Sequence, residues 1–144
     1  MASNRRILCF DFGLKRIGTA VGNTLTKTAQ PLKTAQAKNG IPNWDTINDL
    51  VSEWKPHHLV VGLPLAMDGS EGKSALAARK FGERLQSHTG IPITFVDERL
   101  SSVAADDLLR ESSVGKSITR KRQQSRDGLA AELILQTYFG EQVS

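Results

Sequence analysis

One stretch of the chain decides its fold: R-I-L-C-F-D-F-G-L-K-R-I-G-T-A-V-G, residues 6–22. Residues 6–12 form an apolar run of strand length, interrupted by a single carboxylate, Asp11. Residues 16–23 are rich in small and β-branched side chains, and residues 13–15 have the length of a hairpin turn. The sequence therefore predicts two antiparallel strands, the first of which is buried and carries Asp11.

The pattern beyond this hairpin alternates between strands and helices. Apolar residues at spacings of three and four indicate amphipathic helices, and glycines and prolines separate them from short β-branched runs. We expect, in order, a weak strand over 28–34, a helix over 44–54, a strand over 59–61, a helix over 73–88, a strand over 93–96, a short helix over 101–109 and a last helix over 125–139. This order predicts an α/β fold in which helices flank a mixed five-stranded sheet.

Length and composition set limits on the class of protein. The 144 residues suit a single domain, residues 1–144, and 39% hydrophobic with 24% charged residues excludes wholesale disorder. The start of the chain lacks a signal-peptide pattern, and no apolar run approaches the roughly 18 residues of a membrane span. Cys9 is the single cysteine and lies in an apolar run, so it fits burial in a reducing compartment. We expect a cytoplasmic protein without a membrane partner.

The net charge of +4 is concentrated in one part of the sequence. Residues 99–126 hold seven of the 19 basic side chains and three of the 15 acidic ones, which leaves twelve of each sign elsewhere. Clustered Lys and Arg are typical of a polyanion partner, because they displace counterions from phosphates. A solvated loop explains the same cluster equally well on charge alone.

Carboxylates occur where several apolar elements begin or end. Asp11 lies in the first strand, Asp97 and Glu98 follow the last strand, and Asp127 opens the last predicted helix. If the first strand is central, these positions can converge, and converging carboxylates need cations to neutralise their repulsion. Oxygen ligands of this kind suit Mg²⁺ or Mn²⁺, and two such ions about 3.5–4 Å apart can promote phosphodiester cleavage.

Each carboxylate also has a plain structural explanation. Asp127 could simply complement the positive end of a helix, and Glu98 could pair with Arg99 or Arg126. Asp11 is harder to explain in this way, since a buried strand carboxylate without a partner is costly. Other chemistries find less support: no Cys and His set has zinc spacing, and the glycines fit neither a dinucleotide-binding loop nor a P-loop.

Four motifs together resemble the YqgF family, also called RuvX. They are DFGLKRIGTAVG at 11–22, VVGLPLAMDGSEG at 60–72, VDERLSS at 96–102 and RDGLAAELILQ at 126–136. Members of this family have the ribonuclease H-like fold and are described as pre-16S rRNA nucleases, and earlier as Holliday junction resolvases. The resemblance implies that Asp11, Glu98 and Asp127 are the catalytic, metal-binding carboxylates, with Asp97 as a further catalytic candidate.

One position departs from the related junction resolvase RuvC. By analogy with RuvC, an acidic residue would end the first strand that follows a helix, but here that strand ends in Gly62, Leu63 and Pro64. The second carboxylate would therefore come from another strand. This departure bears on the placement of a second metal ion and on junction cleavage, and fold analogy does not settle the substrate.

The basic cluster acquires a function beside these carboxylates. We expect it to hold the phosphates of a nucleic acid near the metal ions, which positions the substrate without reading its sequence. The predicted phosphate-binding residues are Lys15, Arg16, Arg99, Lys116, Arg120, Lys121, Arg122 and Arg126.

These features predict a metal-dependent endonuclease of structured nucleic acid. The family implies processing of the 5′ end of pre-16S rRNA, with cleavage of branched DNA junctions as the alternative. A non-catalytic module that binds nucleic acid or the ribosome is the alternative from another class. The chain could act as a monomer or a homodimer, because a two-fold junction favours a dimer and an rRNA end does not require one.

Overall fold

The computed structural model describes residues 5–65, 68–97 and 120–142, with side chains left out of the description for 120–127 and 141–142. Its strands are β1 (Arg6–Asp11), β2 (Arg16–Asn23), β3 (Thr28–Pro31), β4 (Ala35–Lys38), β5 (Ile41–Pro42), β6 (His58–Leu63) and β7 (Ile93–Asp97). Its helices are α1 (Trp44–Trp54), α2 (Lys73–Thr89) and α4 (Arg120–Gln142).

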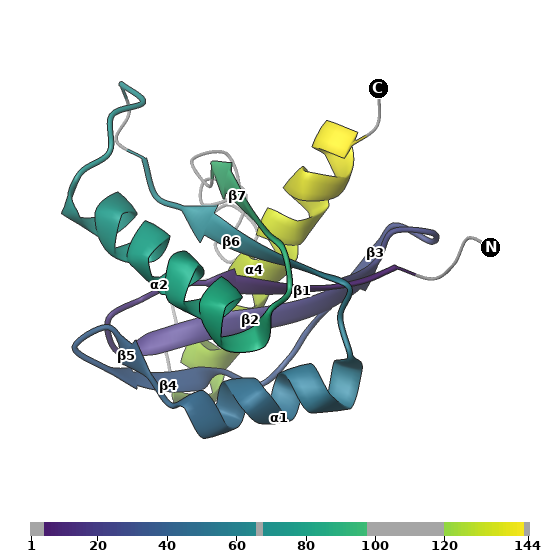
Figure 1. Cartoon of the computed structure of the whole chain (residues 1–144), viewed down its shortest axis with the longest axis horizontal. Coiled ribbons are helices and arrows are strands. Elements are labelled where there is room, and N and C mark those ends of the chain that lie inside the picture. The colour runs from purple at the N-terminus through teal and green to yellow at the C-terminus, as the bar shows by residue number, and fades with distance from the viewer. Residues whose placement is uncertain (1–4, 66–67, 98–119, 143–144) are drawn as a thin grey trace.

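The strands form one mixed sheet in the order β5-β4-β2-β1-β6-β7, and β3 pairs with a further part of β2. The hairpin predicted around residues 13–15 is confirmed, since β1 and β2 are antiparallel with Asp11 opposite Gly18. β1 is parallel to β6, and β6 is parallel to β7. β1 therefore lies inside the sheet, and its carboxyl end lies at the same edge as those of β6 and β7 (Figure 1).

Helices cover both faces of this sheet, because the strand side chains alternate between two hydrophobic cores. Leu8 and Phe10 of β1 point to the face packed by α1 and α2. Ile7 and Cys9 point to the opposite face, packed by α4. Figure 1 shows α4 crossing the sheet behind β1, with α1 and α2 in front.

The prediction of five strands is wrong, because the described residues already form a seven-stranded sheet. The third predicted strand, 28–34, ends early at Pro31, and the chain then forms the short β4–β5 hairpin before α1. The residues of β4, Ala-Gln-Ala-Lys, have little intrinsic strand preference. Pairing with the start of β2 holds them in the sheet, and a local pattern does not reveal such long-range pairing.

The last helix begins earlier than the sequence predicts. The sequence predicts that this helix begins at about residue 125, but α4 starts at Arg120. Arg, Lys and Gln are good helix formers, so a basic segment without apolar periodicity can still extend a helix. Asp127 is therefore not in the first turn, and stabilisation of the helix end does not explain it.

The other two helices match their predicted ranges closely. Asn43 caps α1 by accepting a hydrogen bond from the Asp45 backbone N–H at 3.1 Å, and Gly90 ends α2 in the left-handed conformation. The short helix predicted over 101–109 lies outside the described residues. Within the described part of the chain, no helix combines the length and apolar character needed to cross a bilayer.

Candidate nucleic-acid and metal site

Asp11 is the last residue of β1 and lies at the carboxyl end of a central strand. Its side chain follows the alternation of Ile7 and Cys9, so it belongs to the sheet face that α4 packs against. The residue is half-buried, whereas the four residues before it are fully buried. Asp11 therefore lies where β1 leaves the core and reaches the surface.

Both neighbours of Asp11 in the sheet are glycines. Gly18 of β2 is directly opposite Asp11, and Gly62 of β6 follows the Phe10–Val61 pair by one residue. Neither neighbour therefore places a side chain beside the carboxylate on this face. Gly62 was visible in the sequence as a departure from RuvC, but the role of Gly18 depends on strand register, which only the paired structure gives.

The β1–β2 loop forms an open pocket next to Asp11. The pocket has a volume of about 400 Å³ and is lined by residues 11–16. Lys15 and Arg16 are exposed there, so the structure brings these two predicted phosphate ligands together with Asp11. Gly13 is required by the turn, because a Cβ at this position would lie 2.5 Å from the Arg16 carbonyl oxygen.

Phe12 anchors this loop to the core. Its ring lies 5.1 Å from the ring of Phe81 on α2, and Phe81 also meets Phe10 edge-on at 5.7 Å. Aromatic contacts of this kind stabilise packing beyond the area that they bury. The direction of the loop beside Asp11 is thus determined by α2.

Asp97 lies at the same end of the sheet but on its other face. It is the last residue of β7 and is level with Leu63, whose side chain packs against Ala75 and Ala78 of α2. The preceding residue, Val96, belongs to the α4 face. Because side chains alternate along a strand, Asp97 shares a face with α2 and not with Asp11.

α4 brings its amino-terminal part to the Asp11 end of the sheet. A Cβ at Gly128 would lie 2.7 Å from Pro31 Cβ, and Phe139 near the other end of the helix packs against Gly22. α4 is therefore antiparallel to β1, and the backbone of Asp127, one residue before Gly128, lies toward the carboxyl end of β1.

For the remaining predicted site residues, the structure does not describe the side chains. Five of them lie on α4 outside the described side chains: Arg120, Lys121, Arg122, Arg126 and Asp127. Three lie outside the described residues altogether: Glu98, Arg99 and Lys116. Within the parts of the chain that are described, no group of three His, Cys, Asp or Glu side chains is arranged to hold a metal ion.

A polar cluster occupies the opposite end of the sheet. His58 Nε2 is 2.7 Å from Thr94 Oγ1, and the His58 ring stacks on Tyr138 of α4 at 6.0 Å. Burial, aided by the charge of Arg5, lowers the pKa of His58. The neutral imidazole is therefore part of the packing between β6, β7 and α4.

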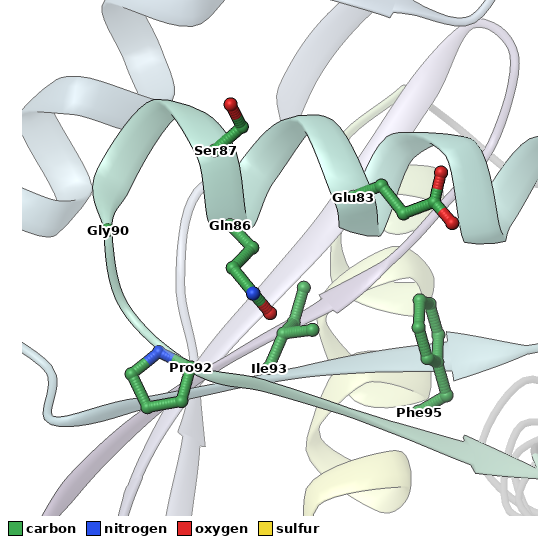
Figure 2. A pocket seen from close by; sticks show the side chains of 7 residues that line it. All are labelled: Glu83, Gln86, Ser87, Gly90, Pro92, Ile93 and Phe95. Carbon is green, nitrogen blue, oxygen red and sulfur yellow. The ribbon is translucent and has the colours of Figure 1, made fainter.

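A second pocket lies on the α2 face of the sheet. It has a volume of about 480 Å³, and Figure 2 shows the residues that line it. Its lining residues are Glu83, Gln86, Ser87, Gly90, Pro92, Ile93 and Phe95. The lining contains one carboxylate and no cation, and it lies toward the amino end of β7, so it is separate from Asp11 and unsuited to phosphates.

Comparison with known proteins agrees with this arrangement. The family model described as "RuvX: Holliday junction resolvase" matches residues 5–141. A protein of Aeromonas salmonicida named "Putative pre-16S rRNA nuclease" is 47% identical over 140 residues, which cover 97% of this chain and 98% of that protein. A protein of Nitrosococcus oceani with the same name is 48% identical over 138 residues, or 96% of this chain and 88% of its own. These names match the nuclease function predicted from the sequence.

Solved structures confirm the ribonuclease H-like fold through their likeness to RuvC-type resolvases. RuvC of T. thermophilus in complex with a Holliday junction substrate has a TM-score of 0.53 at 14% identity, with 96% of each chain covered. The Fowlpox virus resolvase with Holliday junction DNA has a TM-score of 0.55 at 11% identity, with 96% of this chain and 99% of that chain covered. At these identities the likeness concerns the fold alone. The match to the family model over nearly the whole sequence, together with relatives close to half identical, shows that the chain belongs to the RuvX family.

Proposed function

We propose that this chain is a metal-dependent endonuclease that acts on the precursor of 16S rRNA. The observation that carries the proposal is the position of Asp11: a half-buried carboxylate at the carboxyl end of a central strand, in an open pocket with Lys15 and Arg16. The carboxylate can bind a metal ion. The adjacent cations can hold a phosphate close to that ion. The names of the relatives supply the substrate class.

The donor set fits a divalent metal ion at Asp11, and we assign Glu98 and Asp127 as its partners. α4 carries the Asp127 backbone toward the Asp11 end of the sheet, and Glu98 directly follows β7 in the sequence. Asp97 is on the α2 face, so we assign it a supporting role at most.

A bound Mg²⁺ or Mn²⁺, or a pair of them, would supply an activated water and neutralise charge on the phosphate. The side chains of this chain would perform the remaining work. Asp11, Glu98 and Asp127 would bind the metal ion, while Lys15 and Arg16 would hold the phosphate backbone over Asp11. The basic residues Arg99, Lys116, Arg120, Lys121, Arg122 and Arg126 would extend this backbone contact without reading bases.

The test compares wild type with Asp11→Asn on a precursor rRNA fragment, with Mg²⁺, Mn²⁺ or chelator. Cleavage should fall by at least about a hundredfold in the variant, because a metal ion contributes several kcal/mol to charge stabilisation. Binding in chelator should be retained. Asp49→Asn, an exposed change on α1, is the matched control and should cleave as wild type does. Cleavage by Asp11→Asn at the wild-type rate would contradict the proposal.

Junction cleavage is the second candidate, favoured by the family description and by the fold shared with resolvases. A four-way DNA junction in the same assay decides between the two substrates. Metal-dependent cleavage of the junction in place of the RNA, lost in Asp11→Asn, would favour the resolvase. Equal binding by both proteins without cleavage of either substrate would favour a non-catalytic binding module.

A further inference from the structure

The β4–β5 hairpin lies beside the loop that lines the Asp11 pocket (Figure 1). The Ala37 backbone N–H donates to the Lys15 carbonyl oxygen at 2.9 Å, and the Gly40 N–H donates to the Leu14 carbonyl oxygen at 3.0 Å. A Cβ at Gly40 would lie 3.2 Å from Leu14 Cδ2, so the Leu14 side chain lies over the tip of the hairpin. The loop and the hairpin therefore form one continuous surface.

Strand register shows which side chains share the face of Asp11. Ala35 and Ala37 of β4 pack into the core on the α1 and α2 side, so Gln36 and Lys38 take the opposite face. Ile41 is directly opposite Lys38 and shares its face.

Arg16 belongs to the same face, because it is directly opposite Gln36. The residues on this part of the sheet face are Arg16, Gln36, Lys38 and Ile41.

This surface, which we call the hairpin face, is exposed and carries positive charge. Arg16, Gln36 and Lys38 are exposed, Ile41 keeps 57% of its surface and Leu14 keeps 59%. No carboxylate occurs in β2, β4 or β5. Two cations, Arg16 and Lys38, therefore share the Asp11 face of the sheet with the exposed Ile41 side chain, and the exposed Leu14 side chain lies over the tip of the hairpin.

We propose that the hairpin face binds unpaired nucleotides of the substrate next to the scissile phosphate. This inference rests on the proposed nuclease function for the position of the scissile phosphate. Lys38 would contact a backbone phosphate, and Ile41, directly opposite Lys38, would pack against the face of a base. A paired base keeps its faces stacked inside the helix, whereas an unpaired base can turn one toward a protein. The occupant is thus a single-stranded segment.

The distance between β5 and β1 is consistent with a short single-stranded segment. β5 is three strands from β1, or about 14 Å at the usual strand spacing. That span equals about four stacked nucleotides at a rise of 3.4 Å each. The hairpin face would therefore contact nucleotides up to about four positions from the phosphate at Asp11.

Fluorescence anisotropy on two probes tests this inference: an RNA duplex with a four-nucleotide single-stranded extension, and the same duplex without it. All proteins carry Asp11→Asn so that binding is measured without cleavage. Ile41→Ser should weaken binding of the extended probe by about fivefold, because the variant loses the apolar contact that Ile41 makes with a base, and leave the blunt duplex unchanged. Lys38→Ala should reduce the slope of log K against log salt by about 0.7, the value for one phosphate of a single strand.

Leu25 and Lys27 supply the matched controls. They form an equally exposed pair at the β2–β3 turn, at the opposite end of the sheet, so Leu25→Ser and Lys27→Ala should bind both probes as the parent does. Thermal melts should show that all four variants fold, since each substituted side chain is exposed.

Equal binding of the extended probe by the parent and the Ile41 and Lys38 variants would overturn the inference. Equal losses of affinity for both probes would also overturn the inference, because the surface would then bind duplex RNA. A change in sedimentation coefficient in place of a change in RNA binding would identify a contact between protein copies and refute the inference. Loss of wild-type cleavage in the Asp11→Asn assay tests the nuclease itself, so the two proposals fail separately.

Discussion

Gly22 on β2 controls how closely α4 approaches the sheet. A Cβ at this position would lie 2.7 Å from Leu135 Cδ2, 2.9 Å from Phe139 Cζ and 2.7 Å from the Thr28 carbonyl oxygen. Carbon atoms in contact are usually about 3.5–4.0 Å apart, so Gly22→Ala requires a displacement of about 1 Å. The Thr28 oxygen belongs to the paired backbone of β3, so β3 must shift as well as α4.

Stability and cleavage should both decrease in this variant. Overpacking of this size costs about 1–3 kcal/mol, which lowers the melting temperature of a domain of this length by about 3–10 °C. Asp127, which we propose as a metal ligand, lies on the same helix, and misplacement of a catalytic group by about 1 Å can lower a rate by about a hundredfold. We therefore expect a larger loss in the cleavage rate than in RNA affinity.

Calorimetry and single-turnover cleavage of the precursor RNA measure these two effects. Gly140→Ala is the matched control, because it lies on α4 with no atom within 4 Å of the new Cβ. That change should leave cleavage unaltered and stabilise the helix by up to about 1 kcal/mol. A Gly22→Ala protein as stable as wild type, with unaltered cleavage, would refute the account of α4 as the element that positions Asp127.

Two further predictions concern the packing around the site. The pKa of His58 is lowered in the folded protein, so the unfolded chain takes up the proton more readily, and stability should decline as pH falls below 6.5; His58→Gln should remove this part of the pH dependence in urea titrations. Phe81→Ala should lower the free energy of unfolding by about 3–5 kcal/mol, because Phe81 is buried against Phe10 and Phe12, while Phe81→Leu should lose less. Chemical denaturation measures both Phe81 changes, and equal stability of Phe81→Ala and wild type would contradict the role assigned to this ring.

The local pattern of the sequence was enough to predict most of the secondary structure. The β1–β2 hairpin and the helices α1 and α2 have strong signals, because their burial imposes a period of two or of about four residues. Asp11 was identifiable for the same reason, as a carboxylate in an otherwise apolar strand. The four motifs added the family, which the comparisons confirm.

The tertiary structure decided the features that depend on distant partners. Short strands such as β4 exist because another strand pairs with them, so their own residues give little signal. The register of β6 and β7 places Asp97 on the face opposite Asp11, and sequence order does not specify a face until the pairing is known. The sequence by itself determined which side chains could perform the chemistry. The sheet decided which of them share a face, because alternation separates neighbours along a strand and pairing brings distant residues together.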